Sequence, residues 1–206
     1  MANPQYPKYP LMTTPKGVAV FPWLTRADTK FNKDGVYHTG LALDPNDPGV
    51  PEFLAKLDEI HAEAVEITKK SLGKAKIKAQ PIYEPEEDED GNPTGRVIIK
   101  CKTNAVKNGA KVDLAIFDAK RNPHPKNIPV YGGSVLRIAV GPSARYVQSK
   151  LFVTLYIVGV QVIELQTGGG VSGMFDEEDG YEAPEGGAPE SSFDDGDDTE
   201  GDDDLY

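Results

Sequence analysis

The sequence places short segments rich in β-branched and aromatic residues between Gly, Pro and Asn signals, and this pattern constrains the fold more than any other feature. The expected strands are GVAVFPWL (17–24, interrupted by Pro22), VYHTGLAL (36–43), RVIIKCKTNA, VDLAIFD, SVLRIAV and the long YVQSKLFVTLYIVGVQVIELQ. So many strands exclude a helical bundle, and the absence of alternating strand–helix units excludes a parallel sheet. The pattern predicts a mainly β fold, a small closed or partly open antiparallel barrel with one appended helix.

One segment has helical periodicity, from about residue 51 to residue 72. Pro51 suits the first turn of a helix, and Gly73 suits the position after its last turn. His61 falls beside the apolar stripe, where a structural role is expected. The apolar residues of this stripe recur every three or four positions: Phe53, Leu57, Ile60, Ala64 and Ile67.

Cys101 lies in the alternating segment RVIIKCK, on the same face as Val97 and Ile99 and opposite Lys100 and Lys102. It is therefore predicted to be a small core residue. A catalytic thiol is the alternative, but no His-containing motif lies nearby in the sequence. A single cysteine excludes an internal disulfide framework, and we expect a reducing compartment.

No motif supports catalysis, a cofactor or a metal. GGGVSG (168–173) matches a dinucleotide-binding fingerprint literally, but the acidic MFDEEDGYE follows it where a helix N-terminus is needed. DEDGNPTG resembles the start of a calcium loop and lacks the closing bidentate Glu. No apolar run is long enough to span a membrane, and the first residues lack the layout of a secretion signal.

Charge is strongly segregated along the chain. Fifteen of the 33 acidic residues lie from Met174 onward, where no Lys, Arg or His occurs. Residues 1–173 therefore carry 18 acidic and 22 basic side chains, a charge of about +4, although the net charge of the chain is −11. Such an asymmetry indicates a body that binds a polyanion. A solubilising tail on an ordinary domain is the alternative.

Basic and aromatic residues are interleaved in three segments of the body. Single-stranded nucleic acid requires this mixture, because cations contact phosphates while exposed aromatic rings stack on bases. Burial in the core is expected for Phe21 and Phe152. The candidate contacts for single-stranded DNA are Trp23, Arg26, Lys30, Phe31, Lys33, Lys100, Lys102, Arg145, Tyr146 and Lys150.

The acidic tail has too few apolar residues and too many like charges to form a core, so disorder is expected. A tethered polyanion would compete with nucleic acid for a cationic groove and, once released, bind a basic partner protein. The chain ends on two apolar residues that could anchor in a pocket of that partner. The partner-binding residues of the tail are predicted to be Asp202, Asp203, Asp204, Leu205 and Tyr206.

Several segments resemble the single-stranded DNA-binding protein of T-seven-like, short-tailed phages. They are GVYHTGLAL before a Pro-rich break and the helix, RVIIKCK, NIPVYGGSVLRIAV, and VTLYIVGVQVIELQTGGG leading into FDEEDGYE. The resemblance spans about residues 17 to 206. It implies an oligonucleotide-binding (OB) barrel with a helix inserted between strands, acting in phage DNA replication, recombination and repair in the cytoplasm of the infected host.

The resemblance also implies a homodimer whose tail engages the phage DNA polymerase and helicase-primase, with Tyr206 in place of a terminal Phe. It maps the family's aromatic-basic cluster onto Arg145, Tyr146 and Lys150, although the tryptophan and lysine richness of that cluster is reduced here to PSARYVQSK. Phe21 and Trp23 match the aromatic-bearing first strand. The family's N-terminal basic residues are poorly matched.

The expected organisation is an extended N-terminal arm (1–16), an OB domain (17–167), and a Gly-rich hinge with a disordered acidic tail (168–206). The leading functional hypothesis is sequence-nonspecific binding of single-stranded DNA. An acidic adaptor or DNA mimic that binds a basic protein and no nucleic acid is the alternative, although it gives no reason for a basic body. Binding of single-stranded RNA shares the same physics.

Overall fold

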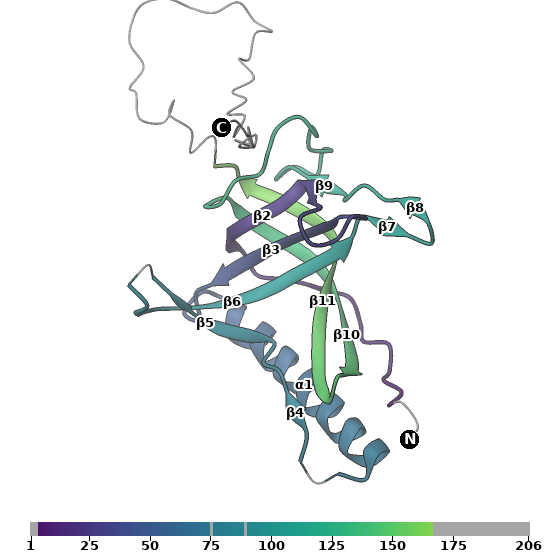
Figure 1. Ribbon diagram of the computed structural model, residues 1–206. Helices are drawn as coiled ribbons and strands as arrows, with labels where there is room; N and C mark the ends of the chain where they lie inside the picture. Colours follow the sequence, from purple (N-terminus) through teal and green to yellow (C-terminus); the bar gives the residue numbers. More distant parts are fainter. Residues whose placement is uncertain (1–3, 75, 89, 167–206) are drawn as a thin grey trace, which may run out of the picture.

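A computed structural model describes residues 4–74, 76–88 and 90–166, and it shows a curled β-sheet above one long helix (Figure 1). In chain order the elements are β1 (Met12–Thr13), β2 (Gly17–Asp28), β3 (Val36–Leu43), α1 (Val50–Leu72), β4 (Lys78–Ala79), β5 (Tyr83–Glu87), β6 (Pro93–Asn104), β7 (Val106–Lys107), β8 (Ala110–Lys111), β9 (Ile116–Phe117), β10 (Val135–Val147) and β11 (Lys150–Glu164).

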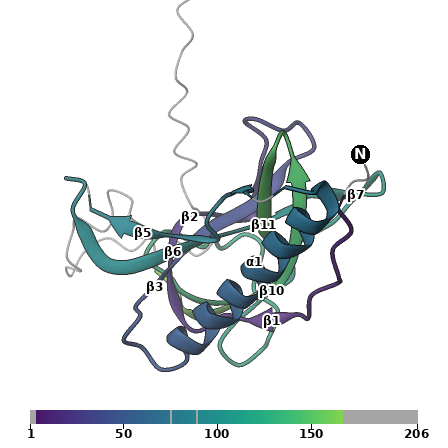
Figure 2. The same cartoon turned by 90° about the horizontal axis from the view of Figure 1, so that it is seen from below.

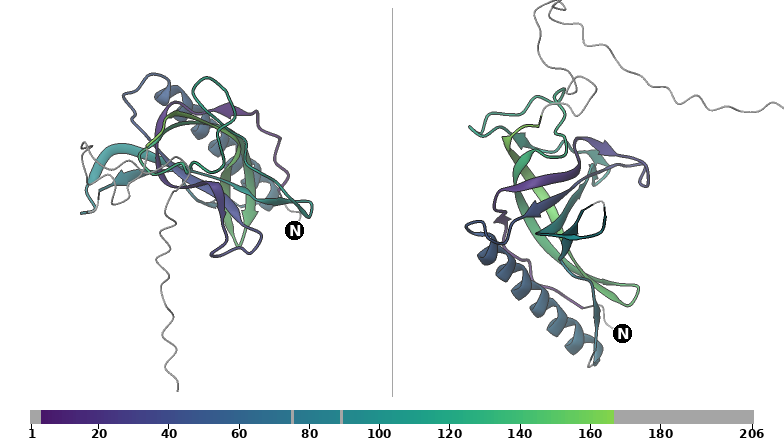
Figure 3. Two further views of the ribbon diagram at one scale, coloured as in Figure 1. Left: turned by 90° about the horizontal axis from the view of Figure 1, so that it is seen from above. Right: turned by 90° about the vertical axis from the view of Figure 1, so that its left-hand side faces the viewer.

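Five long strands close into a barrel. β2 pairs with β3, β3 with β6, β11 with β10, and β10 returns to pair with β2, all antiparallel, while β6 and β11 pair in parallel. Viewed from above, these strands form a ring (Figure 3, left). A small five-stranded barrel of this kind is the OB fold. The predicted mainly β fold class is therefore confirmed.

The helix α1 matches its prediction closely. It starts directly after Gly49 and ends before Gly73, whose φ of 61° is the left-handed conformation that glycine adopts most easily. The helix crosses beneath the barrel, where Figure 2 shows it from below. Its buried side chains are Val50, Phe53, Leu57, Ile60, Ala64 and Thr68, so the predicted stripe faces the barrel.

The core lies between the inner face of the barrel and α1. Leu41, Ile99 and Leu136 are fully buried there, and Cys101 is 1% exposed. Burial raises the pKa of the Cys101 thiol to about 12, because the charged thiolate loses its hydration. Cys101 is therefore a core residue, as predicted. His61 Nε2 lies 3.1 Å from the backbone oxygen of Gln80, a structural contact.

The strand after Tyr146 differs from the prediction of one long strand. The chain reverses at Gln148 and Ser149, so that residues 135–147 form β10 and residues 150–164 form β11. Both turn residues have positive φ, 51° and 63°. Such a tight turn usually carries Asn or Gly, and neither residue is present at this position to signal the turn.

Two other predicted strands have different lengths. The first was expected to end at Leu24, but β2 continues to Asp28 and shortens the following loop to residues 29–35. Of VDLAIFD, only β9 is a strand.

The N-terminal segment lies along the barrel and α1. The Tyr6 hydroxyl is 2.7 Å from Thr68 Oγ1 on α1, and Thr14 exchanges backbone and side-chain hydrogen bonds with Ile138 on β10. The predicted Gly-rich hinge and acidic tail lie outside the described residues. No helix in the part of the chain that the structure describes is long and apolar enough to cross a membrane.

Candidate nucleic-acid interface

The register of the barrel places four side chains in one row across its outer face. Trp23 is opposite His38, His38 opposite Lys102, and Lys102 opposite Tyr156. Directly paired residues share one face of a sheet, so this row crosses β2, β3, β6 and β11. This row faces away from the core. Cys101, which precedes Lys102 in β6, points inward and is buried, and successive residues of a strand point to opposite faces.

A β-bulge in β2 exposes an aromatic ring beside this row. Between Val20 and Trp23, β2 contains one residue more than β3. Phe21 lies in the bulge with a φ of 46°, and its side chain is 83% exposed. Pro22 is tolerated here because a bulge does not require the N–H that proline lacks. Phe21 was predicted to be buried, and this prediction is wrong.

A groove of about 660 Å³ lies over β3 and β6, bordered by Phe21. Its floor is open because Gly40 has no side chain. A Cβ at Gly40 would lie 3.3 Å from Ile98 Cγ2, closer than most real contacts. The basic side chains that line the groove are His38, Lys100 and Lys102. An apolar floor beside an exposed ring and cations can accept a base while its phosphate stays at the rim.

Hydrogen bonds and stacking fix the Trp23 end of the row. The Arg26 guanidinium lies over the Trp23 ring, 5.3 Å from its centroid, and the His38 ring centroid is 6.5 Å away. Asp28 accepts a hydrogen bond from the Lys30 backbone N–H at 2.8 Å and lies 3.2 Å from His38 Nε2. The Lys30 N–H and then His38 lower the pKa of the Asp28 carboxyl, so Asp28 is an anion that positions both groups.

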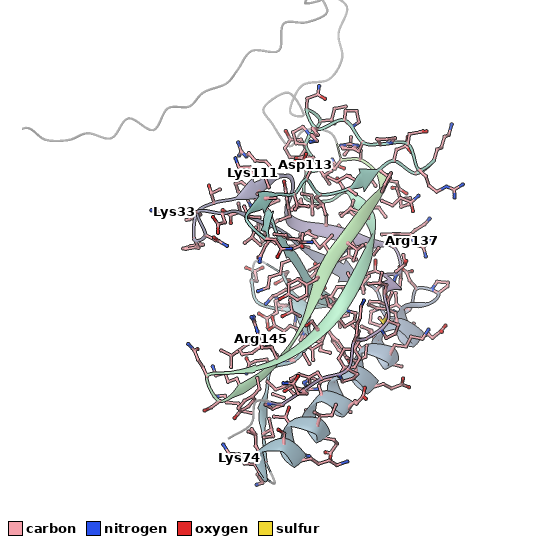
Figure 4. All side chains as sticks on the ribbon, turned by 90° about the vertical axis from the view of Figure 1, so that its right-hand side faces the viewer. Lys33, Lys74, Lys111, Asp113, Arg137 and Arg145 are labelled. Atoms are coloured by element: carbon pink, nitrogen blue, oxygen red, sulfur yellow. The ribbon has the colours of Figure 1, made fainter. Side chains whose placement is uncertain are left out.

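Two hairpins project from the same side of the barrel and flank its outer face (Figure 3, right). The β2–β3 loop carries Lys30, Phe31 and Lys33. Phe31 is 90% exposed, and Lys30 Nζ lies 5.5 Å from its ring centroid. The β10–β11 hairpin carries Arg145 and Lys150 near its tip. Lys33 and Arg145 lie on one side of the molecule, toward opposite ends (Figure 4).

The predicted cluster of Arg145, Tyr146 and Lys150 is divided between the two faces of this hairpin. Arg145 pairs with Phe152 on the exposed face, while Tyr146 pairs with the fully buried Leu151 on the other face. The ring of Phe152 is 37% exposed, so its predicted burial in the core is also wrong. The aromatic partner of Arg145 is therefore Phe152.

One carboxylate lies inside the groove. Glu84 Oε2 is 2.6 Å from Lys100 Nζ, and both side chains are largely exposed. A phosphate at Lys100 would take the position of this carboxylate. Glu84 therefore competes with any anion that enters the groove.

No protein-family model matches the sequence, and a comparison with curated proteins finds no match. Among solved structures, gp2.5, a single-stranded DNA-binding protein encoded by bacteriophage T7, is similar with a TM-score of 0.64 and 21% identity. The similarity covers 84% of this chain and 98% of gp2.5. The single-stranded DNA-binding protein from bacteriophage Enc34, in complex with single-stranded DNA, has a TM-score of 0.57 and 13% identity over 78% of this chain and 89% of that chain. The chain has the fold of phage single-stranded DNA-binding proteins.

The fold resemblance predicted from the sequence motifs is thus confirmed. Within this phage-protein fold, the groove collects Lys100 and Lys102, with Trp23 and Arg26 beside it, while the remaining predicted residues lie on the flanking hairpins. OB folds in general bind oligonucleotides on the second and third barrel strands and on the loops joining strands 1–2 and 4–5. In this barrel those parts are β3 and β6, the β2–β3 loop and the β10–β11 tip.

Sequence reasoning missed three residues of the outer face: Phe21, His38 and Tyr156. Pro22 after Phe21 was the available signal for a bulge. Tyr156 becomes part of the face only through the parallel pairing of β11 with β6, which no local pattern encodes. Among the residues that the structure describes, no three His, Cys, Asp or Glu side chains cluster closely enough to hold a metal ion.

Proposed function

We propose that this protein binds single-stranded DNA without sequence preference and catalyses no reaction. The observation that carries the proposal is the outer face of the barrel, where Phe21 and the row from Trp23 to Tyr156 combine exposed rings with cations around one groove. The similarity of the fold to phage proteins that bind single-stranded DNA supports it.

The binding mechanism follows from the cationic and the aromatic side chains of this face. Lys100 and Lys102 release counterions when they contact phosphates, which gives sequence-independent affinity that falls as salt rises. Phe21 and Trp23 offer faces on which any base can stack, at about 1–3 kcal/mol per base. Duplex DNA hides its bases, so the rings select single strands.

The proposal extends to a role in phage DNA replication, recombination and repair in the cytoplasm of the infected host. The acidic tail competes with DNA for the groove and recruits the phage DNA polymerase and helicase-primase through Asp202, Asp203, Asp204, Leu205 and Tyr206. The protein acts as a homodimer. The position of 15 acidic residues after a basic body in the sequence supports separate roles for the body and the tail.

A fluorescence titration with oligothymidylate tests DNA binding, because Trp23 is the only tryptophan. Stacking on a base should quench its emission, and the affinity should fall steeply with salt. Lys102→Gln should weaken binding and reduce the magnitude of the log–log salt slope by about 0.7. Lys56→Gln on α1, outside the groove, is the matched control and should bind normally. Absence of binding in dilute buffer would overturn the proposal and favour an adaptor that binds a basic protein.

A further inference from the structure

A pair of lysines lies side by side where β4 joins the barrel sheet. β4 pairs in parallel with the start of β11, which places Lys78 opposite Lys150 and Ala79 opposite Leu151. The Gln80 N–H donates to the Leu151 oxygen at 2.9 Å and extends this pairing. Leu151 is fully buried, so the two lysines lie on the outward face. Adjacent strands are about 4.8 Å apart, and like charges directly opposite each other destabilise a sheet. A bound anion would remove this repulsion.

Further cations lie on the segments that carry this pair. The segment between α1 and β4 adds Lys74 and Lys76, and Arg145 lies on the same face of the hairpin as Lys150. Among the described residues, none of these cations takes part in an ion pair. In Figure 4, Lys74 and Arg145 lie at one end of the molecule, away from Lys33 and Lys111 at the other.

The exposed face of the hairpin connects these cations to the groove. Arg145 pairs with the partly exposed Phe152, and Thr154, two residues further along β11, lines the groove together with Lys100. Cations and an exposed ring therefore follow one another along a single surface. A flexible strand of phosphates and bases matches this sequence of groups better than a small anion does.

We infer that Lys76 and Lys78 form, with Arg145 and Lys150, a second phosphate-binding site that holds the backbone of a single DNA strand after it leaves the groove. The site lengthens the footprint of one protein molecule beyond the barrel face. It rests on the proposed function, since it takes the same strand as the groove.

Binding to short and long oligothymidylates separates the two sites. An oligomer of about 5 nucleotides is near the lower end of the site sizes known for one OB fold, and one of about 20 nucleotides exceeds them. For Lys76→Gln/Lys78→Gln, affinity for the long oligomer should fall about 10-fold, and the magnitude of its log–log salt slope by about 1.4, because two phosphate contacts are lost. Affinity for the short oligomer should change less than about 2-fold, since a short strand fills the groove first.

Two controls make the result specific. Lys56→Gln/Lys120→Gln changes the net charge equally away from the hairpin and should leave both affinities unchanged, whereas Lys76→Arg/Lys78→Arg should retain tight binding. Three outcomes would overturn the inference. They are an equal loss of affinity for both oligomers, an equal loss of affinity in the charge control, and no loss of affinity in a Lys76→Gln/Lys78→Gln variant whose thermal unfolding is normal. If the unmodified protein binds neither oligomer, the proposed function fails first.

Discussion

At Phe21, one extra residue in β2 changes which side chains face the core. Strict alternation along GVAVFPWL would place Phe21 and Trp23 inward with Ala19, which is buried. The bulge before Trp23 reverses this alternation, and both rings lie outside. A non-glycine residue with a left-handed φ is strained, and such strain persists where it serves a site. We therefore expect the exposed ring to be the side chain through which the bulge serves the proposed DNA site.

Phe21→Gly should separate binding from stability. Glycine adopts a φ of 46° without strain, so the free energy of unfolding should stay the same or rise by up to about 1 kcal/mol. The affinity for oligothymidylate should fall about 10-fold, because one stacking surface is lost. Urea unfolding and DNA titration of the same preparation measure both quantities. A loss of 2 kcal/mol or more of stability would instead mean that the ring is packed in the core.

Glu84→Gln should strengthen DNA binding. The substitution frees Lys100 from a carboxylate 2.6 Å away, and exposed ion pairs of this kind contribute about 0.2–1 kcal/mol. We expect an affinity increase of about 1.5- to 5-fold at low salt. Glu52→Gln breaks a similar exposed pair with Lys56 on α1 and is the control. Equal gains in both variants would indicate a general effect of net charge.

Tyr9 should make stability depend on alkaline pH. Burial first, and then the nearby Glu63, raise the pKa of its hydroxyl to about 12. The folded state therefore favours the neutral hydroxyl. The contribution of Tyr9 to the free energy of unfolding is complete below about pH 10 and is lost as the pH rises from about 10 to 12. The free energy of unfolding of Tyr9→Phe should fall less steeply with pH in this window. At pH 7 it should be more stable by about 1 kcal/mol, because Tyr9 Oη is buried without a hydrogen-bond partner among the described residues. Equal pH profiles in urea unfolding would contradict this assignment.

Among the elements, α1 and the β10–β11 hairpin differ most in how well the sequence predicts them. The boundaries of α1 are encoded locally by Pro51, Gly73 and a 3.6-residue period, so they were predicted to within one residue. The hairpin reverses at Gln148 and Ser149, which carry no turn signal, so the break between its two strands was predicted at residues 141–145 instead. Its turn conformation is imposed by the pairing of β10 with β11, a tertiary contact. The residues of the predicted cluster could be named from the sequence, but the face of the hairpin that each one occupies depended on this turn, with Arg145 and Lys150 on one face and Tyr146 on the other.

Replacing this turn by Asn-Gly should stabilise the hairpin. Both turn residues of the present chain have positive φ, which Asn and Gly adopt at lower cost. Gln148→Asn/Ser149→Gly should raise the free energy of unfolding by about 1 kcal/mol. The affinity for oligothymidylate should stay within about 2-fold, because Arg145 and Lys150 are retained. A decrease in thermal stability would mean that the present side chains make contacts that the turn requires.

For the whole molecule, the charge of the body and the charge of the acidic tail have opposite signs. The body carries about four net positive charges. Lys100 and Lys102 line the groove, and Figure 4 shows Lys33 and Arg145 at the two flanking hairpins. The 15 acidic residues of the last 33 are tethered to this surface, so their effective concentration near it is high whatever the protein concentration. On the proposed function, DNA displaces them when it binds.

Removal of residues 167–206 should therefore tighten DNA binding at low salt, by about 10-fold or more, since tethered competitors act at millimolar effective concentration. The two forms should converge as salt rises, because screening weakens the contact between tail and body along with that between DNA and body. Titrations with oligothymidylate across a series of salt concentrations measure this convergence. A full-length variant with the 15 tail carboxylates replaced by Asn and Gln keeps the length and removes the charge, and it should behave like the truncated form. If that variant binds like the unmodified chain while truncation tightens binding, the tail acts by steric exclusion. If neither change alters the affinity, the tail does not compete for the groove, and the charge segregation serves only the recruitment of partner proteins.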